Sequence, residues 1–232
     1  MGTFGKQTPK CLLKINKKYI IEYIIEDLIS QKIPQKDITL AVGYKSHKIK
    51  RILNRKYKLQ FINIPNYNIN GSSFSWFCFK RKWKLRKSPL VVMHADIYYD
   101  KTLLKKILIS KYKNIISSVS RSEKFSKKRW IIEKDRKNKI INFKNIYCIP
   151  GKNYNEVGCI NKFSSKYADS IFKYMKRYFR INGKNFTWEI VINDFIKNKK
   201  IKIYSPSFKI KYWFNINTKD DLKASKSYIK KN

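Results

Sequence analysis

Acidic residues are scarce in this sequence: its 232 residues include only 15 Asp and Glu, against 54 Lys and Arg. The resulting net charge of +39 would ordinarily indicate a nucleic-acid or anionic-membrane partner. However, the basic residues are spread along the whole chain, and Lys, Ile, Asn, Tyr and Phe are abundant together, which indicates a drift in composition. We therefore do not expect nucleic acid as the main partner, and we treat each of the few carboxylates as informative.

Signals for an extracytoplasmic protein are also lacking. The four cysteines show no C-x-x-C spacing, which argues against a disulfide framework and favours a reducing compartment. No apolar run approaches the ~18 residues of a membrane span, and the first residues contain no signal-peptide core. There is no G-x-x-x-x-G-K-[ST] phosphate loop either. We expect a cytoplasmic protein without a membrane partner.

One apolar segment ends in a carboxylate. Residues 89–96 read PLVVMHAD, a Val-rich run bounded by Pro and followed by polar residues, which predicts a buried strand of a parallel sheet. Ligands of open α/β sheets bind outside the carboxyl ends of the strands, where Asp96 would lie. A carboxylate there can hold a divalent cation against a polyphosphate. These residues alone fit an Asp that merely begins a loop equally well.

Strands and helices alternate up to about residue 120, which argues for a parallel α/β sheet. Beyond that point two β segments flank the turn sequence DRKN (135–138), which predicts a hairpin. With no internal repeat or linker, we expect a single domain, 1–232, with a small β-rich insertion. The expected helices are 19–29, 45–53, 74–79, 102–110, 164–180, 187–197 and a terminal one; the expected strands outside the hairpin are 38–42, 59–64, 89–93, 114–119, 156–160, 200–204 and 211–214.

Three local patterns carry further expectations. Glu22, Glu26 and Asp27 lie on the polar face of the first long helix, where we expect them to be solvated. Residues 65–73 (PNYNINGSS) offer neutral hydrogen bonds suited to a base or ribose, and an ordinary connection with a Ser N-cap fits equally. Residues 218–221 (TKDD) predict a capping box at the start of the terminal helix.

Taken in order, four segments resemble the nucleotidyltransferase superfamily that makes nucleotide-activated sugars and cytidylyl-activated phosphocholine or aminoalkylphosphonates. They are TPKCLL (8–13) with the following IIEY (20–23), VGY (42–44), VMHAD (92–96) and WFNINTKDDL (213–222). Together they span nearly the whole chain. The resemblance implies an α/β fold with a Rossmann-like, mixed and mostly parallel sheet and helices on both faces. It also implies a nucleotide-binding half at 1–120 and an acceptor-binding half at 121–232.

The sequence departs from the superfamily pattern in two places. Members begin with a buried strand leading into a Gly-x-Gly-x-Arg loop, whereas Met1 stands inside that loop here and Phe4 stands where Arg is expected. We therefore expect the N-terminal strand and part of the Gly-rich loop to be missing, which leaves a truncated or degenerate relative open. Asn215 and Asn217 stand where many members carry acidic metal ligands, so a weaker metal site is expected.

The resemblance implies transfer of a nucleoside monophosphate from an NTP, such as CTP, to a small phosphorylated acceptor, with release of pyrophosphate. Lys10 and Asp96 would be catalytic, Lys10 as a point charge on the α-phosphate. Asp96, Asn217 and Asn215 would hold Mg²⁺. A nucleotide-sugar glycosyltransferase is the alternative enzyme, but it usually needs an Asp-x-Asp pair, which residues 96–98 (DIY) lack. The implied nucleotide-binding residues are Gly2, Thr3, Lys6, Gly71, Ser72 and Ser73.

Acceptor binding is predicted for Trp130, Tyr154 and Glu189. An aromatic face with a nearby carboxylate suits an ammonium group such as that of phosphocholine. Core packing is the alternative explanation for aromatic residues in this part of the chain.

Overall fold

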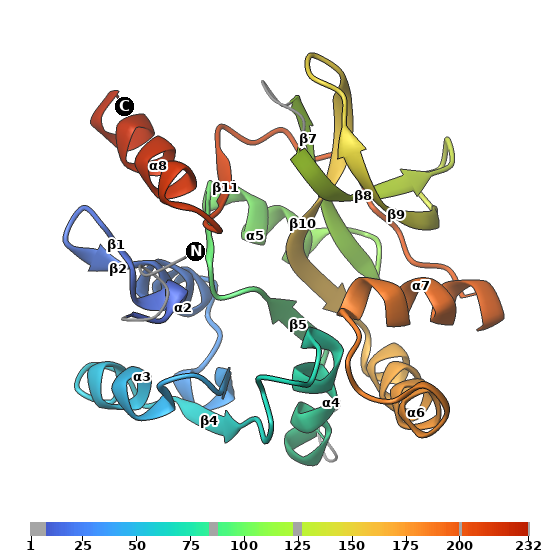
Figure 1. The fold of residues 1–232 in the computed structure, drawn as a ribbon, viewed down its shortest axis with the longest axis horizontal. Coiled ribbons are helices and arrows are strands. Elements are labelled where there is room, and N and C mark those ends of the chain that lie inside the picture. Colours follow the sequence, from blue (N-terminus) through green and yellow to red (C-terminus); the bar gives the residue numbers. More distant parts are fainter. Residues whose placement is uncertain (1–7, 84–87, 123–126, 200, 232) are drawn as a thin grey trace. The chain divides into compact units, whose positions relative to one another are not determined.

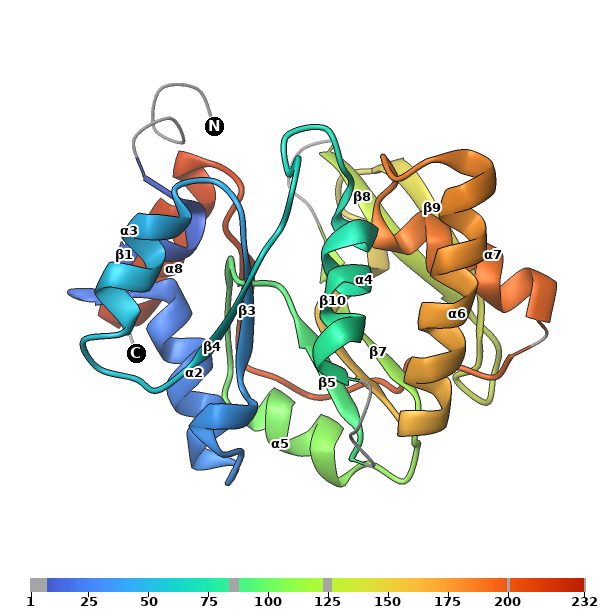
Figure 2. The same ribbon diagram turned by 90° about the horizontal axis from the view of Figure 1, so that it is seen from below.

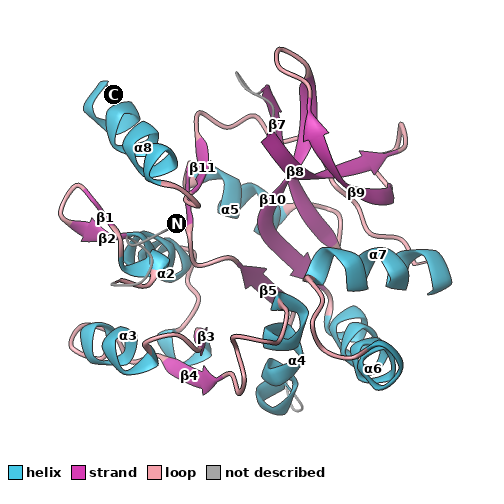
Figure 3. Ribbon diagram, viewed as in Figure 1, coloured by secondary structure: helices cyan, strands magenta, loops and turns pink. Residues whose placement is uncertain are grey.

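The computed structural model of the chain describes residues 8–83, 88–122, 127–199 and 201–231 (Figure 1). Helices and strands are mixed along the chain, as Figure 3 shows, so the predicted α/β class is confirmed. None of the helices in these ranges has the length and apolar character needed to cross a membrane.

The chain divides into two compact units, each assembled from segments that are distant in sequence. Unit 1 comprises Met1–Asn68, His94–Lys105 and Ile210–Asn232. Unit 2 comprises Ile69–Met93 and Lys106–Lys209. We describe each unit by itself. The predicted functional halves, divided at residue 120, stay a prediction.

The described residues of unit 1 form three short two-stranded ladders and the helices around them. Strands β1 and β2 form a hairpin, β3 and β4 pair in parallel, and β6 and β11 pair antiparallel. Helix α5 (Thr102–Ile109) begins in unit 1 and continues into unit 2. The other elements of unit 1 are η1 (Lys10–Leu12), β1 (Lys14–Ile15), β2 (Lys18–Tyr19), α2 (Ile20–Ser30), η2 (Gln35–Asp37), β3 (Thr39–Val42), α3 (Ser46–Leu53), β4 (Gln60–Asn63), β6 (Ile97–Tyr99), β11 (Trp213–Asn215) and α8 (Lys219–Lys231).

Helix α2 confirms the helix predicted at 19–29, but its acidic residues are not on a solvated face. Glu22 and Asp27 are each only 2% exposed. Glu22 forms an ion pair of 2.6 Å with Lys56, and Asp27 accepts a hydrogen bond of 2.8 Å from the Tyr99 hydroxyl. Only Glu26 keeps a partly exposed side chain. The solvation prediction was wrong for Glu22 and Asp27, because helical periodicity does not reveal donors supplied by segments far along the chain.

The ladder between β6 and β11 brings the middle of the chain against its last strand. Tyr98 lies opposite Phe214, and Ile97 lies opposite Asn215. Just after β11 the predicted capping box is present: Thr218 N donates to the Asp221 carboxylate at 2.8 Å, and Asp221 N donates to the Thr218 hydroxyl at 3.1 Å. This cap fixes where α8 begins and therefore orients the turn at 215–218.

Unit 2 is built on a five-stranded sheet. Strand β10 is central: it pairs antiparallel with β5, β7 and β8, and β8 pairs antiparallel with β9. Helices α4, α6 and α7 pack on one another, α6 against β10 and α7 against β9 (Figure 2). The elements are α4 (Ser72–Trp83), β5 (Leu90–Met93), β7 (Ile115–Ser122), β8 (Lys127–Lys134), β9 (Ile140–Cys148), β10 (Asn153–Phe163), α6 (Ser165–Asn182) and α7 (Trp188–Lys199).

Aromatic packing holds the helices of unit 2 to the sheet. The indole of Trp76 in α4 stacks on that of Trp188 in α7, with ring centroids 4.9 Å apart, and lies 6.0 Å from the ring of Phe163 in β10. Trp188 and Phe163 are fully buried. Aromatic side chains of this size dominate the apolar area that a core removes from water. This cluster therefore fixes α4 and α7 on one face of the sheet.

The direction of the strands differs from the prediction of a mostly parallel sheet. Among the described ladders only β3 and β4 pair in parallel, and the strand at 89–93, found here as β5, pairs antiparallel with β10. A buried apolar run does not encode the direction of its partner. The partner of this run, β10, lies far along the chain, so no short turn sets the direction of the pair. The strand predicted at 200–204 is reduced to bridges at Tyr204, and β6 was not predicted.

Candidate active site

Lys10, Asp96 and Asn217 come together in unit 1 from three distant parts of the sequence. The Lys10 ammonium lies 2.6 Å from Asn217 Oδ1 and 3.5 Å from Asp96 Oδ2. The side chain of Lys10 is 38% exposed and that of Asp96 is 22% exposed. The cluster is thus a partly solvated arrangement of one cation and two oxygen ligands, which a phosphate-bearing ligand can reach.

Local structure positions each member of this cluster. Lys10 follows Pro9 and is the first residue of η1, whose single turn is closed by a hydrogen bond of 3.0 Å from Leu13 N to Lys10 O. Asp96 stands in the turn just before β6, and its backbone oxygen accepts a hydrogen bond of 2.8 Å from Ile216 N. That bond extends the β6–β11 ladder by one step. It therefore carries the segment that contains Asn217 up to Asp96.

Burial favours the neutral forms of the two titratable side chains near Asp96, Cys11 and His94. Burial, reinforced by the negative charge of Asp96, raises the pKa of the Cys11 thiol to about 12. Burial lowers the pKa of the His94 imidazole, and the nearby Asp96 charge opposes that shift only in part. Cys11 is therefore a neutral thiol and not a nucleophile. The charges left at this position are those of Lys10 and Asp96.

The donor set fits the Mg²⁺ ion that the superfamily resemblance implies. Asp96 supplies a carboxylate, and Asn217 and Asn215 supply carbonyl oxygens, which are hard ligands of the kind Mg²⁺ takes. The Asn215 Oδ1 atom is buried and has no hydrogen-bond partner among the described residues, so a cation would satisfy it. No group of three or more His, Cys, Asp and Glu side chains gathers anywhere in the described ranges. With a single carboxylate, the ion would depend on ligand phosphates for much of its coordination.

The predicted nucleotide-binding residues at 71–73 use their polar groups within unit 2. Gly71 N donates to Lys184 O at 2.9 Å, and the Ser73 hydroxyl donates to Phe186 O at 2.8 Å. The Ser72 hydroxyl accepts a hydrogen bond of 3.0 Å from Trp188 N. These contacts join the start of α4 to the segment before α7. A role in binding a base or ribose stays a prediction for these residues. Gly2, Thr3 and Lys6, the other predicted contacts, lie outside the described residues.

Of the three predicted acceptor residues, Trp130 is the one that lines either of the two cavities described here. Trp130 lines an open cavity of about 370 Å³ beside α7, together with Asn193 and Asp194. The Tyr154 hydroxyl accepts a hydrogen bond of 3.1 Å from Ile149 N. Glu189 is buried, which raises the pKa of its carboxyl group. The roles of all three residues in acceptor binding stay predictions.

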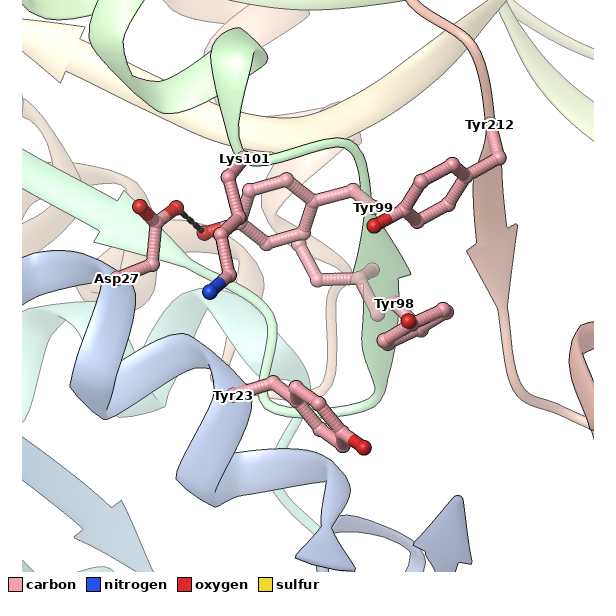
Figure 4. A pocket seen from close by; sticks show the side chains of 7 residues that line it. Tyr23, Asp27, Tyr98, Tyr99, Lys101 and Tyr212 are labelled. Carbon is pink, nitrogen blue, oxygen red and sulfur yellow. Dashed lines mark hydrogen bonds between the residues drawn. The ribbon is translucent and has the colours of Figure 1, made fainter. Parts of the chain in front are cut away.

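Unit 1 contains a second feature that periodicity did not reveal, a cavity of about 210 Å³ lined mainly by tyrosines (Figure 4). Burial raises the pKa of Asp27, whose carboxylate accepts the Tyr99 hydroxyl at its wall. Tyr23, Tyr98 and Tyr212 contribute rings around the opening, with the Tyr98 and Tyr212 rings stacked at 5.2 Å. The signal in the sequence was the pair of tyrosines after Asp96. Their partners on α2 and near β11 required the tertiary fold.

Comparison with solved structures defines the class of fold. CTP:phosphocholine cytidylyltransferase from Streptococcus pneumoniae superposes with a TM-score of 0.79 at 18% identity, covering 99% of this chain and 93% of that one. A UDP-glucose pyrophosphorylase in complex with UDP-glucose gives a TM-score of 0.72 at 14% identity, covering 100% and 94% of the two chains. The chain therefore has the Rossmann-like fold of the nucleotidyltransferases.

A more particular relationship comes from sequence. CTP:phosphoglutamine cytidylyltransferase of Campylobacter jejuni is 33% identical over 111 residues, which are 46% of this chain. The match spans about two fifths (42%) of the length of that relative. No protein-family model matches the sequence. Sequence and fold together relate the chain to the nucleotidyltransferase superfamily, which confirms the resemblance seen in the four ordered segments.

Proposed function

We propose that the protein is a nucleotidyltransferase that transfers a nucleoside monophosphate from an NTP to a small phosphorylated acceptor and releases pyrophosphate. The observation that carries this proposal is that the Lys10 ammonium lies within 3.5 Å of both the Asp96 carboxylate and the Asn217 side-chain oxygen. The similarity to cytidylyltransferases of phosphoglutamine and phosphocholine supports CTP as the NTP. The same similarity supports a small phosphorylated metabolite, comparable in size to phosphoglutamine or phosphocholine, as the acceptor.

In this reaction a phosphate oxygen of the acceptor attacks the α-phosphorus, and the bond from that phosphorus to the pyrophosphate oxygen breaks. Such transfers depend on positioning and charge neutralisation more than on covalent catalysis. Lys10 would neutralise negative charge on the α-phosphate, because its flexible stem lets the ammonium follow the phosphate into the transition state. Asp96 and Asn217 would orient the ammonium and, with Asn215, would hold Mg²⁺. When bound, that ion would neutralise phosphate charge.

No observation supports the glycosyltransferase alternative. Tyr98 stands where the second acid of an Asp-x-Asp pair would be, and its ring packs edge-on against Tyr23 at 5.1 Å. A cytoplasmic location also stays a prediction.

The experiment is a pyrophosphate-release assay with CTP, Mg²⁺ and a panel of phosphorylated acceptors. We expect release that requires both the acceptor and the metal. ATP, GTP and UTP serve as matched controls for the base. A protein that binds CTP but releases no pyrophosphate with any acceptor would be the degenerate relative. A protein that neither binds nor turns over any NTP would contradict the proposal.

A further inference from the structure

The carboxylate of Asp221, in the first turn of α8, binds more of the backbone than a helix cap requires. In a capping box the side chain of the third helical residue accepts the N–H of the capping residue, here Thr218, at 2.8 Å. The same Oδ2 atom also accepts the N–H of Asn217, one residue further back, at 3.0 Å. Asp221 is only 9% exposed, so water competes little for these contacts. One carboxylate oxygen therefore binds both the cap and the residue before it.

That preceding residue, Asn217, belongs to the candidate active site. Its Oδ1 atom accepts a hydrogen bond of 2.6 Å from the Lys10 ammonium. Its backbone N–H is shared between Asp221 Oδ2 at 3.0 Å and Asn215 O at 3.1 Å. Backbone and side chain of Asn217 thus have different partners, and the backbone contact with Asp221 fixes the point from which the side chain projects.

The residues on either side hold the rest of this turn. Ile216 N donates to Asp96 O at 2.8 Å, and the Ile216 side chain is fully buried in an apolar cluster that includes Leu222. Leu222 follows Asp221 in α8, and its N–H donates to Thr218 O at 3.3 Å. The turn is therefore anchored to Asp96 on one side and to α8 on the other, with Asn217 between the two anchors.

Such a contact matters because of the ligands that this site offers. Asp96 is its carboxylate, and the amide oxygen of Asn217 brings no charge, so its value as a ligand depends on its placement. Groups that orient the ligands of a metal are usually worth a factor of about 10 to 100 in metal affinity or activity. Building on the proposed transferase activity, we propose that Asp221 is a positioning residue, which holds the Asn217 backbone so that the side-chain oxygen stays directed at Lys10 and at Mg²⁺.

The test measures how much Mg²⁺ strengthens the binding of CTP. Calorimetry gives the Kd for CTP with saturating Mg²⁺ and with EDTA, both without acceptor, and the ratio of the two values is the metal-dependent gain. In Asp221→Ala we expect this gain to fall about tenfold, with little change of the Kd in EDTA. Asp221→Asn keeps an uncharged oxygen of the same reach, so its gain should fall only about threefold. With an acceptor present, the Mg²⁺ concentration that gives half the maximal rate should rise in the same order.

Two controls separate positioning from helix capping. Thr218→Ala removes the hydroxyl that accepts Asp221 N at 3.1 Å and leaves the contact between Asp221 and Asn217. It should lower the midpoint of urea unfolding, as loss of a cap does, and keep the metal-dependent gain within about twofold of the wild type. Asp220→Ala removes an exposed acid from the same turn and should leave the gain unchanged.

Two results would overturn the inference. One is an undiminished gain in either Asp221 variant. The other is an equal loss of gain in Thr218→Ala, which would assign the effect to the cap.

The outcomes also separate this inference from the proposed function. If the gain falls in the Asp221 variants but no acceptor yields pyrophosphate, the positioning role stands and the proposed reaction fails. If the wild-type protein releases pyrophosphate and the Asp221 variants keep the full gain, the transferase stands and the positioning role fails.

Discussion

The two regions that the sequence assigned to the nucleotide use their polar groups in different ways. Lys10 and Asp96 remain partly exposed, and their charges meet at 3.5 Å. The hydroxyls of Ser72 and Ser73 instead bond to backbone groups of Trp188 and Phe186, and Ser73 is fully buried. The first region has charge that a ligand can reach, and the second has hydrogen bonds that hold α4 in place.

This difference predicts which substitutions should lower activity and which should lower the free energy of unfolding. Removing a charge from the Lys10 cluster should lower activity with little change in the free energy of unfolding, because partly exposed side chains contribute little to it. Disturbing the 71–73 segment should lower the free energy of unfolding, whatever its effect on activity.

The largest expected effect is that of Asp96→Asn. The change removes the one carboxylate of the cluster but keeps its size, so kcat/KM should fall about 10²- to 10³-fold. The midpoint of urea unfolding should move little. Asp220→Asn, an exposed acid in the first turn of α8, is the matched control and should leave the rate unchanged. Full activity in Asp96→Asn would place the metal-binding carboxylate elsewhere.

Gly71→Ala tests the other side of the comparison. A Cβ atom at this position would clash with Phe186 O, a backbone atom that cannot move without shifting the segment before α7. We expect a loss of about 3 kcal/mol in the free energy of unfolding, at the upper end of overpacking costs. Gly151→Ala is the space control, since nothing lies within 4 Å of a Cβ there, although its φ of +78° adds strain of its own. Unchanged thermal unfolding of Gly71→Ala would show that this contact does not constrain the fold.

Within unit 1, Tyr99→Phe tests whether the buried hydrogen bond between Tyr99 and Asp27 contributes to the free energy of unfolding, as the hydrogen bonds of the 71–73 segment should. The change leaves the Asp27 carboxylate without its 2.8 Å hydrogen bond. We expect a loss of about 2 kcal/mol, because a buried acceptor is left unsatisfied. Chemical unfolding monitored by tryptophan fluorescence measures it. Tyr67→Phe, at an exposed position, should have no measurable effect.

The smallest effect concerns pH. Burial raises the pKa of Asp27 in the folded chain, so the folded state holds this proton more tightly than the unfolded state does. Below its unfolded pKa of about 4, Asp27 therefore does not lower the free energy of unfolding. It lowers that free energy as pH rises from there through the higher pKa of the folded state. Urea unfolding between pH 4 and pH 7 should show Asp27→Asn gaining stability relative to the wild type as pH increases. A constant difference across that range would mean that the folded pKa is not raised.

Much of the fold followed from local pattern. The helix at 19–29, the capping box at 218–221 and the hairpin around 135–138 appear where periodicity and turn chemistry placed them. Strand direction did not, because a run such as LVVM is equally apolar beside a parallel or an antiparallel neighbour. The burial of Glu22 depends on Lys56, which lies 34 residues away, and no window over the helix contains that information.

The functional residues were likewise predictable from the sequence only in part. The meeting of Lys10, Asp96 and Asn217 was implied by the order of four segments, because the superfamily resemblance supplied the tertiary arrangement. In unit 2, the sequence did not predict the ion pairs of Glu156 with Arg121 and Arg129, at 3.8 Å and 3.4 Å. Each of these three is an ordinary strand residue until the register of β7, β8 and β10 is known. The scarcity of acidic residues was the available signal, because a Glu in a strand of so basic a chain indicates that it pairs with basic side chains.

Lys10→Met tests the central claim most directly. The variant keeps an unbranched side chain and removes the ammonium that Asp96 and Asn217 share, while Lys36→Met removes an exposed charge from the same unit. The measurement is kcat for pyrophosphate release from CTP with the best acceptor of the panel. We predict a fall of at least about a hundredfold in Lys10→Met at an unchanged unfolding midpoint, and no change in Lys36→Met. A Lys10→Met protein that keeps the wild-type kcat would contradict the account.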